Sequence, residues 1–233
     1  MRALLKLMTL EIRKFKLGGL FKAVLIANLV ILAFMIMVIF IDQGEIDPTF
    51  ATFSEVFDGL SVFVKTTFII FASVLLSKLV IEEYRSNTIS LLFMYPIPRK
   101  SLMTAKLIIV FLFTLVNIIV SNIVLGAIIV GINHFVEVIP GTISLQDAGT
   151  ELVTIMADAV YAAGISLIAL FVGMRKKSVS ATIVTAVLVA SLISSGWGDF
   201  RLGNLVGVSV SLGLVGMVIA YLSIRNVESE DIA

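Results

Sequence analysis

The sequence has no cysteine, a single histidine and few charged residues, and each shortage excludes a class of function. Without cysteine, neither disulfides nor thiolate metal ligands can form. His134 alone does not supply a zinc site, because zinc usually takes about three or four His, Cys or carboxylate ligands. No stretch matches G-x-x-x-x-G-K-[ST], so the chain lacks the P-loop that cradles ATP, and no G-x-S-x-G nucleophile elbow is present. The chain therefore carries no recognisable nucleotide-binding or hydrolase motif.

The shortage of charge indicates a membrane protein. Charged residues make up 14% of the chain and hydrophobic residues 59%, whereas about 25% of a soluble domain is charged. A membrane-spanning helix needs about 20 mostly apolar residues, and backbone polar groups in lipid must be paired within the helix. We therefore predict an all-α polytopic membrane protein with six transmembrane helices, the fifth being the shortest. The six windows are residues 20–41, 60–81, 107–132, 152–172, 179–195 and 205–224.

The distribution of lysine and arginine predicts the orientation. Of the 17 basic residues, only Lys65 and Arg201 fall on the side opposite the termini. Because basic loops are retained in the cytoplasm, we expect both termini to be cytoplasmic and the chain to be a multi-pass protein of the cell membrane.

The chain before the first span has the pattern of an amphipathic helix. Leu5, Met8, Ile12 and Phe15 recur at steps of three and four residues, as on one face of a helix that lies on a membrane surface. A simple basic topology anchor is the alternative. We thus divide the chain into an interfacial helix (1–19), a six-span membrane domain (20–224) and a cytoplasmic tail (225–233).

Polar residues inside the predicted spans are candidates for a transport path or for bonds between helices. Lys65 either pairs with Asp158 or extends toward the membrane surface. The full set is Asp158, Lys65, Asn28, Asn117 and Asn122.

The loop between the second and third spans, residues 82–106, is a charged island between two apolar runs. Thr88 can cap a short helix, and Pro96 ends it because proline disfavours helical geometry in the preceding residue. Leu92 and Phe93 share one face with Ile89. We expect a short amphipathic helix that offers a rigid surface to a cytoplasmic partner.

The same loop resembles a known family. The run Glu82-Glu83-Tyr84-Arg85-Ser86-Asn87-Thr88, followed by Leu91-Leu92, Pro96 and Arg99, is similar to the permease subunits of type-2 ATP-binding-cassette (ABC) transporters. Their pattern is an acid, a basic residue, Gly-Thr, a leucine pair and Pro-x-x-R. Asn87 stands where glycine is usual, which is a mild departure because asparagine tolerates left-handed geometry.

The resemblance implies a function. In that family this loop is the coupling helix, which docks on a separate ATPase subunit that holds ATP and magnesium, so this chain would need no cofactor of its own. The implied partners are the ATPase, a second permease chain (identical or a sister) and the lipid bilayer, with no nucleic acid. The chain would be the permease of an exporter for an amphiphilic substrate such as an antimicrobial or toxin peptide, a drug or a lipid. The implied coupling residues are Glu82, Glu83, Arg85, Asn87, Thr88, Leu91, Leu92, Phe93, Pro96 and Arg99.

Two other functions were weighed. A non-transporting membrane anchor or immunity protein would need no ATPase. An intramembrane protease could use Glu82 and Glu83 with His134, but the predicted topology places the histidine on the other side of the membrane, and acid–base partners must lie within hydrogen-bond reach.

Overall fold

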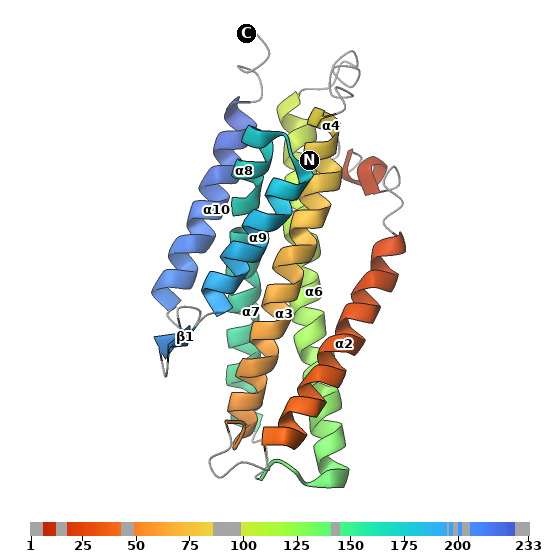
Figure 1. Cartoon of the computed structure of the whole chain (residues 1–233), viewed down its shortest axis with the longest axis vertical. Helices are drawn as coiled ribbons and strands as arrows, with labels where there is room; N and C mark the ends of the chain where they lie inside the picture. The colour runs from red at the N-terminus through yellow and green to blue at the C-terminus, as the bar shows by residue number, and fades with distance from the viewer. Residues whose placement is uncertain are drawn as a thin grey trace.

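The protein is a bundle of long helices in a computed structural model, with two very short strands at one side (Figure 1). The structure describes residues 7–12, 18–42, 49–85, 99–140, 145–194, 196–197, 200–201 and 206–226. Residues 7–12 are helical. The other elements are α2 (Gly18–Asp42), α3 (Phe53–Leu76), the π-helix η1 (Ser77–Ile81), α4 (Glu82–Arg85), α6 (Arg99–Val136), α7 (Leu145–Ser166), α8 (Ile168–Lys176), α9 (Val179–Ser194), β1 (Gly196–Trp197), β2 (Phe200–Arg201) and α10 (Val206–Asn226).

The predicted all-α membrane architecture is confirmed. Within the described ranges, five helical stretches are long and apolar enough to cross a membrane. The sixth predicted helix, α9, is also apolar but has 16 residues, which corresponds to about 24 Å. That is shorter than a hydrocarbon core of about 30 Å. The expectation that this helix would be the shortest of the six is therefore correct.

Several helices extend well past their hydrophobic windows. α3 begins at Phe53 and not near residue 60, because Thr52 and Glu55 form a reciprocal capping box at its start. α6 begins at Arg99 and not near residue 107. Hydropathy marks only the apolar part of a helix, whereas backbone hydrogen bonding continues until a cap or a breaker ends it.

The fourth predicted span is confirmed as one apolar stretch, Asp147–Lys176, but a single turn residue interrupts it. α7 ends at Ser166 and α8 begins at Ile168, with Leu167 in a turn between them. The Leu167 N–H donates to the Gly164 carbonyl at 3.1 Å, a three-residue step that tightens the helix locally. The Ser166 hydroxyl donates to the Ala163 carbonyl at 2.7 Å, and such bonds from serine bend helices.

α3 lies at the centre of the bundle and packs against α2, α6, α7 and α9. Two apolar clusters of buried side chains fill the interior, one around Phe68 and Met35 and the other around Leu76, Leu79 and Val110. Many large apolar side chains on α2, α6 and α10 are exposed, as expected where lipid replaces water around the helices.

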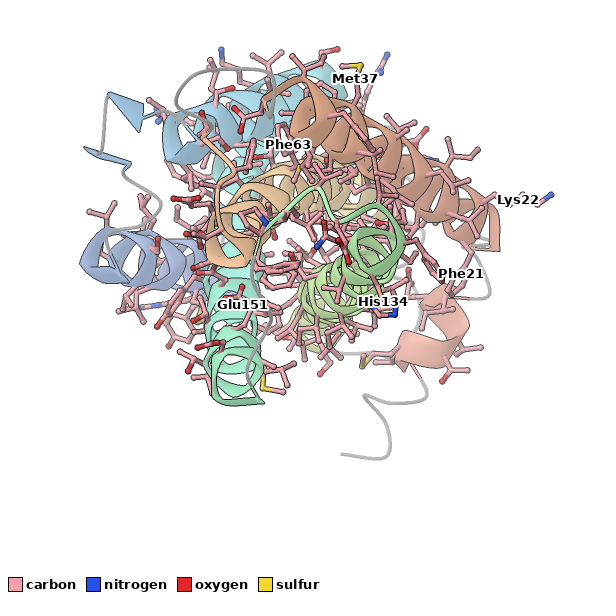
Figure 2. All side chains as sticks on the ribbon, turned by 90° about the horizontal axis from the view of Figure 1, so that it is seen from below. Phe21, Lys22, Met37, Phe63, His134 and Glu151 are labelled. Atoms are coloured by element: carbon pink, nitrogen blue, oxygen red, sulfur yellow. The ribbon has the colours of Figure 1, made fainter. Side chains whose placement is uncertain are left out.

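The first span is only loosely integrated in the bundle. Only 22% of its most apolar window is buried, against 56% for α3. α2 leans away from the bundle toward its N-terminal end (Figure 1), and the Lys22 side chain points outward from the bundle in Figure 2. Its closer packing, through Ile31, Met35 and Ile39, lies in its C-terminal half.

Candidate coupling site and buried ion pairs

The structure describes the two ends of the predicted coupling loop. Glu82, Glu83 and Arg85 form α4, and Arg99 is the first residue of α6. α4 and the start of α6 lie at the same end of the bundle as the C-terminal end of α10 (Figure 1). The remaining predicted coupling residues and the predicted short helix lie outside the described residues: Asn87, Thr88, Leu91, Leu92, Phe93 and Pro96.

Adjacent acids of α4 have opposite environments. Glu82 and Arg85 are exposed, whereas Glu83 is buried with 6% of its surface accessible. Its carboxylate accepts a hydrogen bond from the Lys106 ammonium and forms an ion pair with it. A direct contact between Glu83 and a partner chain would require this pair to open, so the burial assigns Glu83 to the interior, whereas Glu82 and Arg85 lie on the surface.

Lys106 connects three segments of the chain. It is only 2% exposed, and its ammonium also donates to the Leu79 carbonyl at 2.7 Å. The Glu11 carboxylate, itself 5% exposed, lies 3.8 Å from the same nitrogen. We call Lys106, Glu83, Glu11 and the Leu79 carbonyl the stem cluster. Buried charges are tolerated when they are paired and hydrogen-bonded, and the cluster meets that condition for Lys106.

The stem cluster includes an irregular turn of helix. Ser77–Ile81 is π-helical, with the Glu82 N–H bonded to the Ser77 carbonyl, and π segments occur often at functional sites. Ile81 from this segment packs so closely on Gly173 of α8 that a Cβ at Gly173 would lie 2.9 Å from its side chain. The Ser77 hydroxyl is buried and has no hydrogen-bond partner in the described part of the chain.

The helical residues 7–12 lie with one side against the bundle. Met8 packs on the cluster that contains Leu79, and Glu11 points to Lys106. Leu10 and Ile12 are exposed. The predicted amphipathic pattern placed Met8 and Ile12 on one apolar face; in the structure Met8 packs on the bundle and Ile12 is exposed.

A second ion pair connects α3 and α7, and we call it the α3–α7 ion pair. The Lys65 ammonium lies 2.6 Å from the Asp158 carboxylate, with the two side chains 14% and 20% exposed. Ser61 donates to the same carboxylate at 3.3 Å. Of the two alternatives for Lys65, the structure shows the pairing with Asp158. Asp58 and Glu151 are near enough to interact electrostatically, and Glu151 lies toward the end of the bundle nearest the viewer in Figure 2.

The three intramembrane asparagines do not bond to neighbouring helices in the described structure. Asn117 donates to the Phe113 carbonyl at 2.7 Å, and Asn122 donates to the Ile118 carbonyl at 2.9 Å. Both bonds stay within α6. The Asn28 side-chain oxygen on α2 is buried without a partner among the described residues.

α7 and α10 approach each other backbone to backbone. A Cβ at Gly164 would lie 2.7 Å from the Gly213 carbonyl oxygen, and a Cβ at Gly216 would overlap the Gly164 carbonyl. Small residues allow such close helix packing in membranes. These glycines of α7 and α10 therefore pack against each other within one chain.

The geometry excludes the intramembrane protease. His134 lies in the last turn of α6, and Lys106, the partner of Glu83, lies near its start. The 28 residues between them correspond to about 42 Å along the helix. Within the described ranges, no group of three or more His, Asp or Glu residues is placed to hold a metal ion.

Sequence reasoning missed two members of the stem cluster. The sequence places Lys106 only at the end of the predicted loop 82–106 and indicates no role for Glu11. A signal was present for Glu11, which is the only acid among the basic residues 1–19. Nothing in the sequence indicates which acid Lys106 would meet, because the pairing depends on how three distant segments pack.

Comparisons with known proteins agree with this architecture. The model of the ABC-2 family transporter protein matches residues 7–191, which is most of the chain. A protein of Bacillus subtilis (strain 168), named "Uncharacterized protein YcbO", is 37% identical over 227 residues, covering 97% of this chain and 100% of that protein. No solved structure matches. The resemblance inferred from residues 82–99 is confirmed, and the chain belongs to the ABC-2 family of transporter membrane proteins.

Proposed function

We propose that the chain is the permease subunit of an ATP-driven exporter and is coupled to a separate ATPase chain through the loop of residues 82–106. Family membership supports the permease role. The sequence has no P-loop, so ATP and magnesium belong to the partner in this proposal.

The observation that best supports the proposal is the ion pair that holds the two ends of the loop together. Glu83 at the end of the second span is paired with Lys106 at the start of the third, although 23 residues separate them. The helical segments that enter and leave the loop are therefore fixed to each other. A loop on a rigid stem can transmit a push from a partner into both spans, whereas a loop on loose ends would absorb it.

Charge on the surface supports the orientation. Exposed basic residues gather near the α4 end of the bundle, on α4, on α6 and where α8 meets α9. Such residues are retained in the cytoplasm, which would place both termini and the coupling loop on the cytoplasmic side of the cell membrane. The residues are Arg85, Lys100, Arg175, Lys176 and Lys177.

In the proposed mechanism, two ATPase subunits close on ATP and press on the coupling loops of two permease chains, which are identical or sister chains. Glu82 and Arg85 provide exposed charges that fix the register. Thr88, Leu91, Leu92, Phe93 and Pro96 complete the contact. ATP binding then favours one of two packings of the helices by as much as the ATPase prefers that state.

The cargo we propose is amphiphilic, because the bundle exposes wide apolar surfaces to lipid and has short outer connections. Candidate polar positions along its path are Asp158 and Lys65. The Lys65 ammonium and the Asp158 carboxylate are bonded to each other, so a polar cargo group would compete with that bond.

Isolation of the complex tests the proposal. A tagged chain would be co-expressed with the genes that flank its own and purified in lipid nanodiscs. We expect an ATPase with a P-loop to co-purify in a fixed ratio and to hydrolyse ATP. Phe93→Asp should abolish recovery of the ATPase. The matched control is Phe135→Asp, an exposed position in the last turn of α6, which should retain it.

Two results would refute the coupling assignment. If no ATPase co-purifies with the wild-type chain, or if Phe93→Asp retains as much ATPase as Phe135→Asp, the coupling assignment is wrong. A chain that folds and remains in the membrane without any ATPase would fit the anchor or immunity function instead.

A further inference from the structure

We propose that Lys106 is a positioning residue that docks the N-terminal helix, residues 7–12, onto the stem of the coupling loop through Glu11. The helix and the stem would then move as one body when ATP binds. This inference rests on the proposed coupling function and deepens it, because it names the element outside the loop that receives the motion.

Three segments far apart in sequence supply the stem cluster. Lys106 meets Glu83 across 23 residues, and it meets Glu11 from the other end of the chain at 3.8 Å. All three side chains are at least nine-tenths buried. Interactions in such an environment are screened much less than on the surface, so the position of each segment is coupled to the other two.

The second carboxylate of the stem cluster, that of Glu11, indicates that residues 7–12 dock on the stem. One acid is enough to pair with Lys106 and to close the stem, and Glu83 does this with direct hydrogen-bond geometry. Burying a further carboxylate is unfavourable unless it gains an interaction. Glu11 gains the Lys106 ammonium, and this interaction holds residues 7–12 against the bundle.

The packing around Glu11 also supports the docking of residues 7–12 on the stem. Met8, one turn earlier, packs on the apolar cluster that contains Leu79, and the Leu79 carbonyl itself accepts a hydrogen bond from Lys106. One side of the helix thus contacts the stem by both apolar and charged groups, while Leu10 and Ile12 remain exposed.

The consequence concerns the first span. Five residues of sequence separate residues 7–12 from α2 (Gly18–Asp42), and the most apolar window of α2 is only 22% buried, as is that of α10. A stem that carries the N-terminal helix would therefore pull on the N-terminal end of α2, whose packing on the bundle lies mainly in its C-terminal half.

Electron paramagnetic resonance on the permease–ATPase complex in nanodiscs tests this inference. The chain has no cysteine, so spin labels can be placed at two exposed positions, Leu10→Cys on the N-terminal helix and Lys100→Cys at the start of α6. We expect one narrow distance distribution that does not shift between the nucleotide-free state and the state trapped with ATP and vanadate.

Three variants distinguish a loss of docking of residues 7–12 from a loss of folding of the bundle. Glu11→Gln leaves the Glu83–Lys106 pair intact, so the bundle should fold and keep its ATPase, but the narrow distribution should be lost or should shift with nucleotide. Lys106→Arg keeps the charge and should retain the narrow distribution. Glu137→Gln, an exposed acid at the other end of α6, is the matched control and should match the wild type.

Two results would overturn the inference. One is a Glu11→Gln distribution as narrow and as constant as that of Glu137→Gln. The other is a nucleotide-dependent shift in the wild type itself. Both leave the proposed function standing if the ATPase still co-purifies, whereas loss of the ATPase from the wild-type complex would refute the proposed function first.

Discussion

Replacing Lys65 by methionine should destabilise the bundle, because the Asp158 carboxylate would remain between α3 and α7 without its cation. The two charged atoms are 2.6 Å apart, which at an effective dielectric constant of about 20 corresponds to a gross attraction of about 6 kcal/mol. Desolvation of both ions offsets much of it. Breaking a buried pair typically costs about 3–5 kcal/mol, and the residual exposure of 14% and 20% places the expected cost near the lower end, at about 3 kcal/mol.

The assay is thermal unfolding of the purified chain in nanodiscs, as a double-mutant cycle. A loss of about 3 kcal/mol corresponds to a fall in Tm of about 6–12 °C for a chain of this size. Asp158→Leu should cost a similar amount, and the double variant should cost about 2 kcal/mol less than the sum of the two. Lys78→Met, at an exposed lysine of the same span, is the matched control and should stay within about 0.5 kcal/mol of the wild type. Additive single effects, or a Lys65→Met effect as small as that of Lys78→Met, would refute the reasoning.

Three further predictions concern single positions. Gly216→Ala should cost about 1–3 kcal/mol in the same unfolding assay because its Cβ would overlap the α7 backbone. The control Gly207→Ala, where the Cβ meets nothing within 4 Å, should be neutral. Equal effects of the two substitutions would contradict the close approach of the α7 and α10 backbones. Thr52→Ala removes the capping hydroxyl at the start of α3 and should cost about 1 kcal/mol, and unchanged stability would show that the cap is dispensable. Asn28→Leu removes a buried oxygen that has no partner among the described residues, so it should leave stability unchanged or raise it by about 1 kcal/mol; a marked loss would mean that this oxygen has a partner in the complete protein.

The sequence predicts the number and order of the spans well because lipid imposes one strong condition on each of them. An apolar run of about 20 residues must be a helix, and the charge pattern needs no tertiary information. The ends of α3 and α6 were missed because their first turns are polar and depend on a local cap such as Thr52 with Glu55. The break at Leu167 was missed because glycine and serine occur in many unbroken spans.

The site was predictable only in part. The motif around Glu82–Arg99 identified the family, and the Lys65–Asp158 pair was one of two alternatives stated from the sequence. The burial of Glu83 and its pairing with Lys106 could not be predicted, since two adjacent acids in a loop look alike until packing turns one of them inward. The contact between Glu11 and Lys106 could not be predicted either, because the two residues are far apart in the sequence.

The central claim is that this chain receives its energy from an ATPase that contacts the 82–106 loop, and a cross-linking measurement tests it most directly. The chain has no cysteine, so Leu92→Cys provides a single reactive site, with His134→Cys in the last turn of α6 as the control. In membranes that contain the neighbouring ATPase, a cysteine-directed photocross-linker at position 92 should yield an adduct with the ATPase whose amount changes when ATP and vanadate are added, and position 134 should yield none. The account would be contradicted by no ATPase adduct at position 92, or by an equal yield at position 134.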